Sequence, residues 1–272
     1  MKYSLFAFDL DGTFLRSDKS VPEVNLRALR EARSRGAELA VATGRCFAFL
    51  PPELLALPEL RWYITSNGAA LYDRETGCTV CRREIENPQV LRLLRAAENM
   101  NTLIYCYVDD RGITLRQAQD KVCPLPRARR VIDAAMSCGG SYVEDLAAWF
   151  RESGKSAQNI TLFFESAEEQ QRMARYFSAE FPAFHVSLSV LHSIDINAST
   201  KAEALADLCA LLGIEAGQLA AFGDNLNDAS MLSFAGLGVA MANSEKGLFP
   251  YADMSAPSND EGGVGLVMEE LL

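Results

Sequence analysis

Four short runs of consecutive apolar residues stand out in the pattern of hydrophobic and polar positions along the chain. They cover residues 3–8, 39–42, 62–65 and 219–222, and each run is continuous rather than alternating. Such a run between polar turns is typical of a strand that is buried on both faces, as in a parallel sheet. Helical patterns separate the runs, which indicates right-handed βαβ units. We therefore predict an α/β fold: a mostly parallel sheet with helices on both faces.

Two of the expected helices have recognisable ends. Residues 20–23 (Ser-Val-Pro-Glu) have the spacing of a capping box with proline in the first turn, and Gly36 is suited to end that helix. Residues 200–203 (Thr-Lys-Ala-Glu) repeat the capping-box spacing, and Gly213 is suited to end the second helix.

The middle of the chain, from 83 to 190, has a different pattern. Helical stretches such as 90–97 are interleaved with alternating strands such as 104–108. This combination favours an inserted α+β domain whose antiparallel sheet is open to solvent on one face. We therefore expect two domains: a core formed by residues 1–82 and 191–272, and the insertion at 83–190.

Composition and charge limit the classes of partner. The chain has 272 residues, of which 49% are hydrophobic, and no run approaches the roughly 20 apolar residues that cross a bilayer. The first residues lack an apolar signal segment, so we expect a cytoplasmic protein without a membrane partner. The formal net charge of −10 argues against nucleic acid. A phosphorylated small molecule is also anionic, so an acidic protein that binds one would have to recruit a cation or concentrate its few basic groups at the site.

Polar clusters follow all four of the apolar runs. They are Asp-Leu-Asp at 9–11, Thr-Gly-Arg at 43–45, Ser-Asn-Gly at 66–68 and Gly-Asp-Asn-Leu-Asn-Asp at 223–228. Each one alone has the composition of an ordinary turn. Ligands of open α/β sheets, however, bind beyond the carboxyl ends of the strands. We therefore predict that the four clusters converge on one crevice.

This crevice would contain four carboxylates, those of Asp9, Asp11, Asp224 and Asp228. Carboxylates that lie close together repel one another and raise each other's pKa unless a cation neutralises them. Oxygen ligands without sulfur or histidine suit Mg2+. The sequence thus predicts a magnesium site, which also provides a landing place for phosphate.

Lys201 adds a second positive charge to the expected site. It lies in the first turn of a capped helix, where free backbone N–H groups and the helix dipole favour an anion. The chain has neither a G-x-S-x-G motif nor a Walker-type loop, which disfavours a Ser-His-Asp hydrolase and a P-loop enzyme. With a metal, carboxylates and a phosphate cradle, the simplest chemistry is an aspartyl-phosphate intermediate.

These motifs resemble those of the haloacid dehalogenase superfamily of phosphohydrolases. Residues 9–13 (Asp-Leu-Asp-Gly-Thr) match its first motif, Thr43 its second, Lys201 its third and 223–228 its fourth. The stretch Ile-Thr-Ser-Asn-Gly-Ala-Ala-Leu-Tyr-Asp at 64–73 resembles the Cof-type branch. The resemblance implies a Rossmann-like core with an inserted α/β cap that determines substrate specificity.

The resemblance also implies catalytic and metal-binding roles. Asp9 would be the nucleophile and a metal ligand. Asp11 would be the general acid and then the general base, with its backbone carbonyl on Mg2+. Asp224 would bind Mg2+ directly, and Asp228 would support a metal-bound water.

Four further residues would contact the phosphoryl group according to the same resemblance. Thr43, Gly44 and Lys201 would hold phosphoryl oxygens, and Asn227 would orient the phosphate. The expected activity is that of a phosphoric monoester hydrolase acting on small phosphorylated metabolites such as sugar phosphates. A phosphomutase of the same superfamily and a non-catalytic phosphate-binding regulator remain as alternatives.

Overall fold

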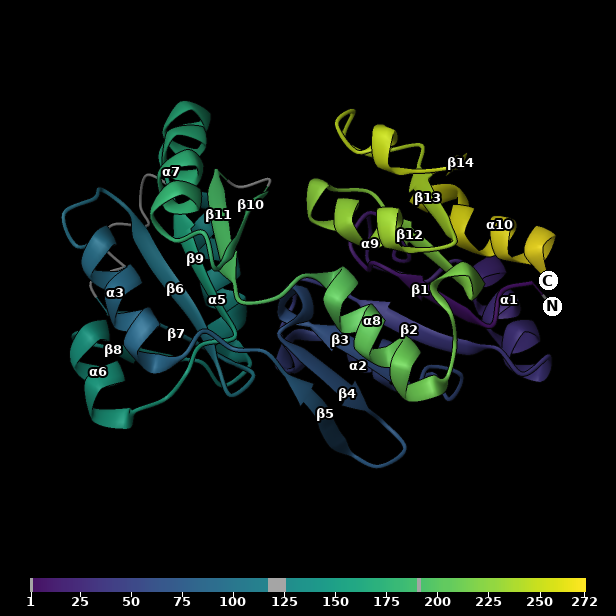
Figure 1. The fold of residues 1–272 in the computed structure, drawn as a ribbon, viewed down its shortest axis with the longest axis horizontal. Helices are drawn as coiled ribbons and strands as arrows, with labels where there is room; N and C mark the ends of the chain where they lie inside the picture. Colours follow the sequence, from purple (N-terminus) through teal and green to yellow (C-terminus); the bar gives the residue numbers. More distant parts are fainter. Residues whose placement is uncertain (1, 117–125, 190–191) are drawn as a thin grey trace. The chain divides into compact units, whose positions relative to one another are not determined.

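The protein is represented by a computed structural model that describes residues 2–116, 126–189 and 192–272. The chain forms two compact units, each built around its own sheet (Figure 1). We call the first the core unit; it consists of Met1–Gly44, Pro51–Arg82 and Thr200–Leu272. The second, the inserted unit, consists of Arg45–Leu50 and Arg83–Ser199.

The core unit contains an eight-stranded sheet in the order β14-β13-β12-β1-β2-β3-β4-β5. Its strands are β1 (Leu5–Phe8), β2 (Glu38–Ala42), β3 (Trp62–Thr65), β4 (Ala70–Asp73), β5 (Cys78–Arg82), β12 (Leu219–Gly223), β13 (Leu237–Met241) and β14 (Met254–Ala256). The four apolar runs become β1, β2, β3 and β12, which are neighbours and parallel. The predicted parallel sheet is confirmed, and β4 and β5 extend it as an antiparallel edge.

Helices cover both faces of this sheet, as the sequence predicts (Figure 1). They are α1 (Glu23–Ser34), α2 (Pro52–Leu55), α8 (Lys201–Leu212), α9 (Ala229–Phe234) and α10 (Gly263–Leu271). α8 and α9 bury residues such as Leu205 and Leu232 against one face, where Leu5, Ala40 and Ile64 lie. α1 and α10 pack against each other on the opposite face.

The strand order of the sheet changes direction at the pair formed by β1 and β12. Strands β2 and β3 are added on one side of β1, whereas β12, β13 and β14 are added on the other. A reversal of this kind leaves a crevice at the carboxyl ends of the two central strands. Asp9 directly follows β1, and Asp224 directly follows β12.

The two predicted helix starts have different outcomes. Thr200 and Glu203 form the capping box before α8, and Gly213 ends that helix in the left-handed conformation, so both predictions are confirmed. The predicted capping box before α1 is wrong. α1 begins after Pro22 without a side-chain cap, because the hydroxyl of Ser20 donates to Asp18 instead.

The inserted unit contains a six-stranded sheet in the order β10-β11-β9-β6-β7-β8. The strands are β6 (Leu103–Val108), β7 (Arg111–Leu115), β8 (Ser141–Val143), β9 (Asn159–Phe163), β10 (His185–Ser189) and β11 (Ser193–Asn197). The helices are α3 (Asn87–Ala97), α5 (Pro126–Ser137), α6 (Leu146–Ser153) and α7 (Ala167–Glu180). The pairing is antiparallel except between β7 and β8, which are parallel.

Hydrophobic side chains pack on both faces of this second sheet. Residues such as Ile160 and Ile194 face α3, α6 and α7 and form the main hydrophobic cluster of the unit. The opposite face is not fully open, contrary to the expectation, because Ala128 and Ile132 of α5 pack there with Tyr105. α5 thus buries the aromatic part of the second face.

The inserted unit reaches further along the chain than the sequence predicted. It extends to Ser199 rather than ending at 190, because β11 pairs with β9 and β10 instead of joining the core sheet. It also includes Arg45–Leu50, where the Cys46 thiol lies 3.2 Å from the carbonyl oxygen of Asp110. Strand pairing and packing, which local patterns do not encode, set these boundaries.

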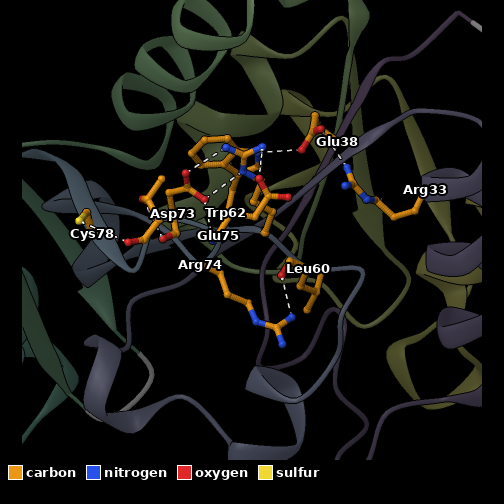
Figure 2. A network of polar contacts seen from close by, with 10 residues as sticks. Arg33, Glu38, Leu60, Trp62, Asp73, Arg74, Glu75 and Cys78 are labelled. Carbon is orange, nitrogen blue, oxygen red and sulfur yellow. Dashed lines mark hydrogen bonds and ion pairs between the residues drawn. The ribbon is translucent and has the colours of Figure 1, made fainter.

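A polar network fixes the core sheet at the amino ends of β2 and β3 (Figure 2). Arg61 makes two hydrogen bonds to the nearly buried Asp73, at 2.9 and 3.0 Å. Trp62 Nε1 donates to Glu38 at 2.9 Å, and Glu38 also pairs with Arg33 of α1. The network therefore lies at the end of these strands opposite to Thr43 and Ser66, which follow β2 and β3.

In the part of the chain that the structure describes, every helix is too short or too polar to cross a membrane.

Candidate active site

The carboxylates that follow the two central strands lie close together. Asp9, Asp224 and Asp228 each place one carboxylate oxygen within 4.8 Å of the other two. Asp9 and Asp228 are buried, and Asp224 is partly buried. β1 and β12 are in register from Leu5 with Leu219 to Phe8 with Phe222, so the residues that follow them leave the sheet side by side.

Lys201 is the counter-charge of this cluster. Its side chain is fully buried, and its Nζ lies 2.7 Å from Asp9 Oδ1 and 2.6 Å from Asp228 Oδ1. A buried lysine requires such partners, because an unpaired ammonium group loses its hydration without compensation. The capping box at Thr200 fixes the first turn of α8 and therefore the point from which this side chain extends.

The side chain of Asp228 holds the loop after β12 through hydrogen bonds to its backbone. Its Oδ1 accepts from Lys201, and its Oδ2 accepts from the backbone N–H groups of Asp224 and Asn225, at 3.0 and 3.1 Å. A carboxylate with both oxygens occupied in this way holds its loop in one conformation. Asp9 and Asp224 are therefore better placed than Asp228 to contact a cation directly.

Burial and mutual repulsion change the acidity of two carboxyl groups. Burial, followed by the charges of Asp228 and Asp224, raises the pKa of Asp9 to about 8, although Lys201 opposes the shift. Burial and the charge of Asp228 also raise the pKa of Asp224 to about 7. The metal-free site thus holds extra protons near neutral pH. A cation would displace them, because carboxylate ligands bind in the ionised form.

The stability of the metal-free protein should consequently fall as the pH rises. The folded pKa values of Asp9 and Asp224 lie above the ordinary value of 3.8, so between about pH 4 and 8 these two groups bind more protons in the folded state. Each full proton lowers the free energy of unfolding by about 1.4 kcal/mol per pH unit of increase. Urea denaturation in EDTA between pH 5 and 8 measures this contribution.

The Asp224→Asn variant is the control for this prediction. It lacks one of the two titrating carboxyl groups, so its free energy of unfolding should depend less steeply on pH than that of the parent. Mg2+ should stabilise the parent more at pH 8 than at pH 5. Identical pH profiles for parent and variant in EDTA would show that Asp224 does not titrate as described.

Asp11 does not belong to the carboxylate cluster and forms an ion pair with Lys19 instead. Its Oδ1 accepts from Lys19 Nζ at 2.7 Å, and both side chains are partly exposed. Lys19 has a left-handed backbone (φ 72°), in a turn whose residue Ser17 bonds to Asp260 through its backbone N–H and its hydroxyl. Asp11 is thus near the carboxylate cluster in sequence, but the cluster itself consists of the other three aspartates.

The remaining candidate residues follow β2 and β12. Thr43 is buried directly after β2, and its backbone carbonyl accepts from the N–H of Asn67 at 3.0 Å. Asn227 is partly buried, and its Nδ2 donates to Asn67 Oδ1 at 3.0 Å. Gly44 also lies next to Asn67, because a Cβ atom at Gly44 would be 3.1 Å from the Asn67 amide oxygen.

Other residues that support the site were not among the candidates from the sequence. Thr13 Oγ1 donates to Asp224 Oδ1 at 2.8 Å, and Asn243 Nδ2 donates to the carbonyl oxygen of Gly12 at 2.8 Å. Gly12 has a left-handed backbone, and a Cβ atom there would lie 2.3 Å from Asp224 Oδ2. The signal for Thr13 and Gly12 was their place in the first motif, and for Asn243 its place after β13.

The donor set fits a hard divalent cation. Two partly free carboxylates, those of Asp9 and Asp224, meet where one lysine offsets only part of the negative charge. Oxygen donors of this kind are typical ligands of Mg2+. Such a cation, held by Asp9 and Asp224, would add positive charge to that of Lys201 and would help to neutralise a phosphoryl group in transfer.

Comparisons with known proteins agree with this chemistry. Residues 6–268 match the model of a family described as haloacid dehalogenase-like hydrolase. The chain is 30% identical to "Phosphatase YwpJ" of Bacillus subtilis, over 98% of this chain and 99% of that protein. It is 26% identical to "Pyridoxal phosphate phosphatase YbhA" of Escherichia coli, over 95% of each.

The similarity extends to solved structures. A haloacid dehalogenase-like hydrolase from B. subtilis matches with a TM-score of 0.83 and 29% sequence identity, over 99% of this chain and 100% of the other. The match covers both the core unit and the inserted unit, so the whole architecture is shared.

Proposed function

Because the chain belongs to the family of haloacid dehalogenase-like hydrolases, we propose that it is a Mg2+-dependent phosphatase of small phosphorylated metabolites. The observation that supports this proposal most strongly is the cluster of Asp9, Asp224 and Asp228, in which the buried Lys201 pairs with Asp9 and Asp228. The names of the relatives, which include a pyridoxal phosphate phosphatase, support a phosphoric monoester as substrate.

In the first half-reaction, Asp9 is the nucleophile. A carboxylate oxygen of Asp9 forms a bond to phosphorus while the bond from phosphorus to the leaving oxygen breaks. Lys201 donates to Asp9 Oδ1 and so fixes the orientation of the carboxylate. Asp11 gives its proton to the leaving alkoxide, which departs as an alcohol.

In the second half-reaction, the aspartyl phosphate is hydrolysed. Asp11, now ionised, takes a proton from a water molecule whose oxygen attacks phosphorus. The bond between phosphorus and Asp9 breaks, which regenerates the carboxylate and releases inorganic phosphate. Because Asp11 is paired with Lys19, it must leave Lys19 and take up a proton from solvent before the first transfer. The proton later taken from water then replaces the one given to the leaving group, so each cycle restores the protonated acid. Leaving Lys19 costs little, because exposed ion pairs contribute only about 0–1 kcal/mol.

The candidate ligands for the cation are Asp9, Asp224 and the backbone carbonyl of Asp11, with Asp228 holding the loop of Asp224. When bound, Mg2+ supplies positive charge that favours the ionised form of Asp9 and neutralises the phosphoryl group. Thr43, Gly44, Lys201 and Asn227 are proposed to bind phosphoryl oxygens. The inserted unit is proposed to select the leaving group.

A screen of the purified protein against phosphorylated metabolites tests this proposal, with inorganic phosphate measured in Mg2+ and in EDTA. We expect Mg2+-dependent release of phosphate from at least one ester. Transfer of the phosphoryl group to a second position of a sugar phosphate, with little phosphate released, would instead identify a phosphomutase. Binding of phosphate esters without turnover of any of them would identify a non-catalytic regulator.

A further inference from the structure

Three consecutive residues after β3 have a left-handed backbone. Ser66, Asn67 and Gly68 have φ values of 50°, 55° and 107°. Ser66 and Asn67 are also buried. Residues with side chains rarely adopt this conformation, and it persists only where the surroundings impose it. The contacts of this turn with its surroundings must therefore hold these residues in the left-handed conformation.

The turn contacts two segments of the proposed phosphate site, the loop after β2 and the start of α8. The backbone N–H of Asn67 donates to the carbonyl oxygen of Thr43 at 3.0 Å. On the other side, Gly68 lies against the start of α8, since a Cβ atom there would be only 2.2 Å from the carbonyl oxygen of Thr200. Lys201 is the next residue. The turn thus keeps a fixed spacing between the loop after β2 and the first turn of α8.

The side chain of Asn67 contacts a third segment. Its Oδ1 accepts from Asn227 Nδ2 at 3.0 Å, although the two residues are 160 positions apart. The same oxygen lies beside Gly44. The amide nitrogen of Asn227 carries two hydrogens, of which Asn67 takes one and leaves the other for a further acceptor. The bond to Asn67 also determines which end of the Asn227 amide is the donor.

We propose that Asn67 is a positioning residue of the phosphate site, which fixes the amide of Asn227 so that its second N–H donates to a phosphoryl oxygen. The inference rests on the proposed function, because it assigns the free N–H group of Asn227 to phosphate. The left-handed turn at 66–68 is the device that brings the Asn67 amide to Asn227. A shift of about 1 Å in a positioning group is enough to weaken such a contact substantially.

The Asn67→Gly variant tests this proposal, because glycine accepts the left-handed backbone while the amide is lost. We expect the inhibition constant for inorganic phosphate to rise about tenfold, equivalent to about 1.4 kcal/mol. KM for a phosphate ester should rise similarly, whereas kcat should change less. A purely structural role would instead lower the melting temperature and leave phosphate binding unchanged, and that result would overturn the proposal.

A double-mutant cycle identifies the route of the effect. If Asn67 acts through Asn227, then Asn227→Ala weakens phosphate binding in the parent but has little further effect in the Asn67→Gly background. In the Asn67→Asp background, which keeps the acceptor oxygen, Asn227→Ala should again weaken binding. Should Asn67→Gly fail to fold, Asn67→Ala, which also lacks the amide, replaces it in the cycle, and an undiminished effect of Asn227→Ala in that background would overturn the proposal.

Asp109→Gly is the matched control. Asp109 has a similar backbone (φ 50°) but lies in an exposed turn of the inserted unit, where its carboxylate pairs with Lys155. Relief of its backbone strain should leave the inhibition constant for phosphate unchanged. Failure of the proposed function is recognised separately: the parent protein would then neither hydrolyse phosphate esters nor bind inorganic phosphate in Mg2+.

Discussion

The Asp9→Asn variant is expected to lose at least about a thousandfold in kcat with any phosphate ester that the parent hydrolyses. The amide of asparagine is not a nucleophile, and no other carboxylate directly follows β1 at this point of the sheet. The fold should survive, because an uncharged side chain avoids the cost of burying a carboxylate whose pKa is already raised to about 8. Steady-state kinetics and chemical denaturation measure both effects.

Mass spectrometry of the acid-quenched protein gives a direct measure of the proposed intermediate. With an ester that has a good leaving group, Asp11→Asn should accumulate phosphoprotein, because its second half-reaction lacks the general base. Asp9→Asn should accumulate none. Glu180→Gln, the same chemical change at an exposed site at the end of α7, is the control and should match the parent. Substantial turnover by Asp9→Asn would exclude the proposed nucleophile.

The second large effect is expected from Lys201→Met. This change leaves the carboxylate of Asp228, and that of Asp9 where it is ionised, buried without an ammonium partner. Breaking a buried ion pair in this way costs about 3–5 kcal/mol. We expect that loss in the free energy of unfolding at neutral pH in EDTA, together with loss of phosphatase activity. Mg2+ should restore part of the stability, because it replaces some of the missing positive charge.

Two further variants separate the effect of an unpaired buried charge on the free energy of unfolding from the effect of losing any lysine. Lys155→Met removes an exposed partner of Asp109 and should change the free energy of unfolding by less than about 1 kcal/mol. Adding Asp228→Asn to Lys201→Met should recover stability without recovering activity, because one unpaired buried charge is removed. If Lys201→Met were as stable as the parent in EDTA, the ion pairs of Lys201 would not contribute to the free energy of unfolding.

Much of the architecture could be predicted because it depends on local patterns. The four apolar runs become β1, β2, β3 and β12, and the capping box of α8 lies at Thr200. The motifs at the ends of these strands were also sufficient to indicate the family. The predicted boundary at 190 failed, because only pairing with β9 and β10 shows that β11 belongs to the inserted unit.

The roles assigned to the site residues stay predictions. The structure does show hydrogen-bond and ion-pair partners of these residues, which the sequence could not indicate. Asp228 has both oxygens engaged within the protein, and Asp11 pairs with Lys19. Asn67 was visible in the polar cluster after β3, yet its importance depends on its contact with Asn227. Such contacts depend on strand order and side-chain direction, which a local pattern does not specify.

The sequence by itself determined which residues leave the carboxyl ends of the buried strands and which chemistry their functional groups allow. It did so because strand runs, turns and caps are encoded by residues close together in the chain. Only the tertiary structure decided which charge faces which. Lys201 reaches Asp9 across 192 positions because β1 and β12 are neighbours and α8 begins at the same edge of the sheet. That pairing buries the lysine and keeps the carboxylate of Asp9 in place.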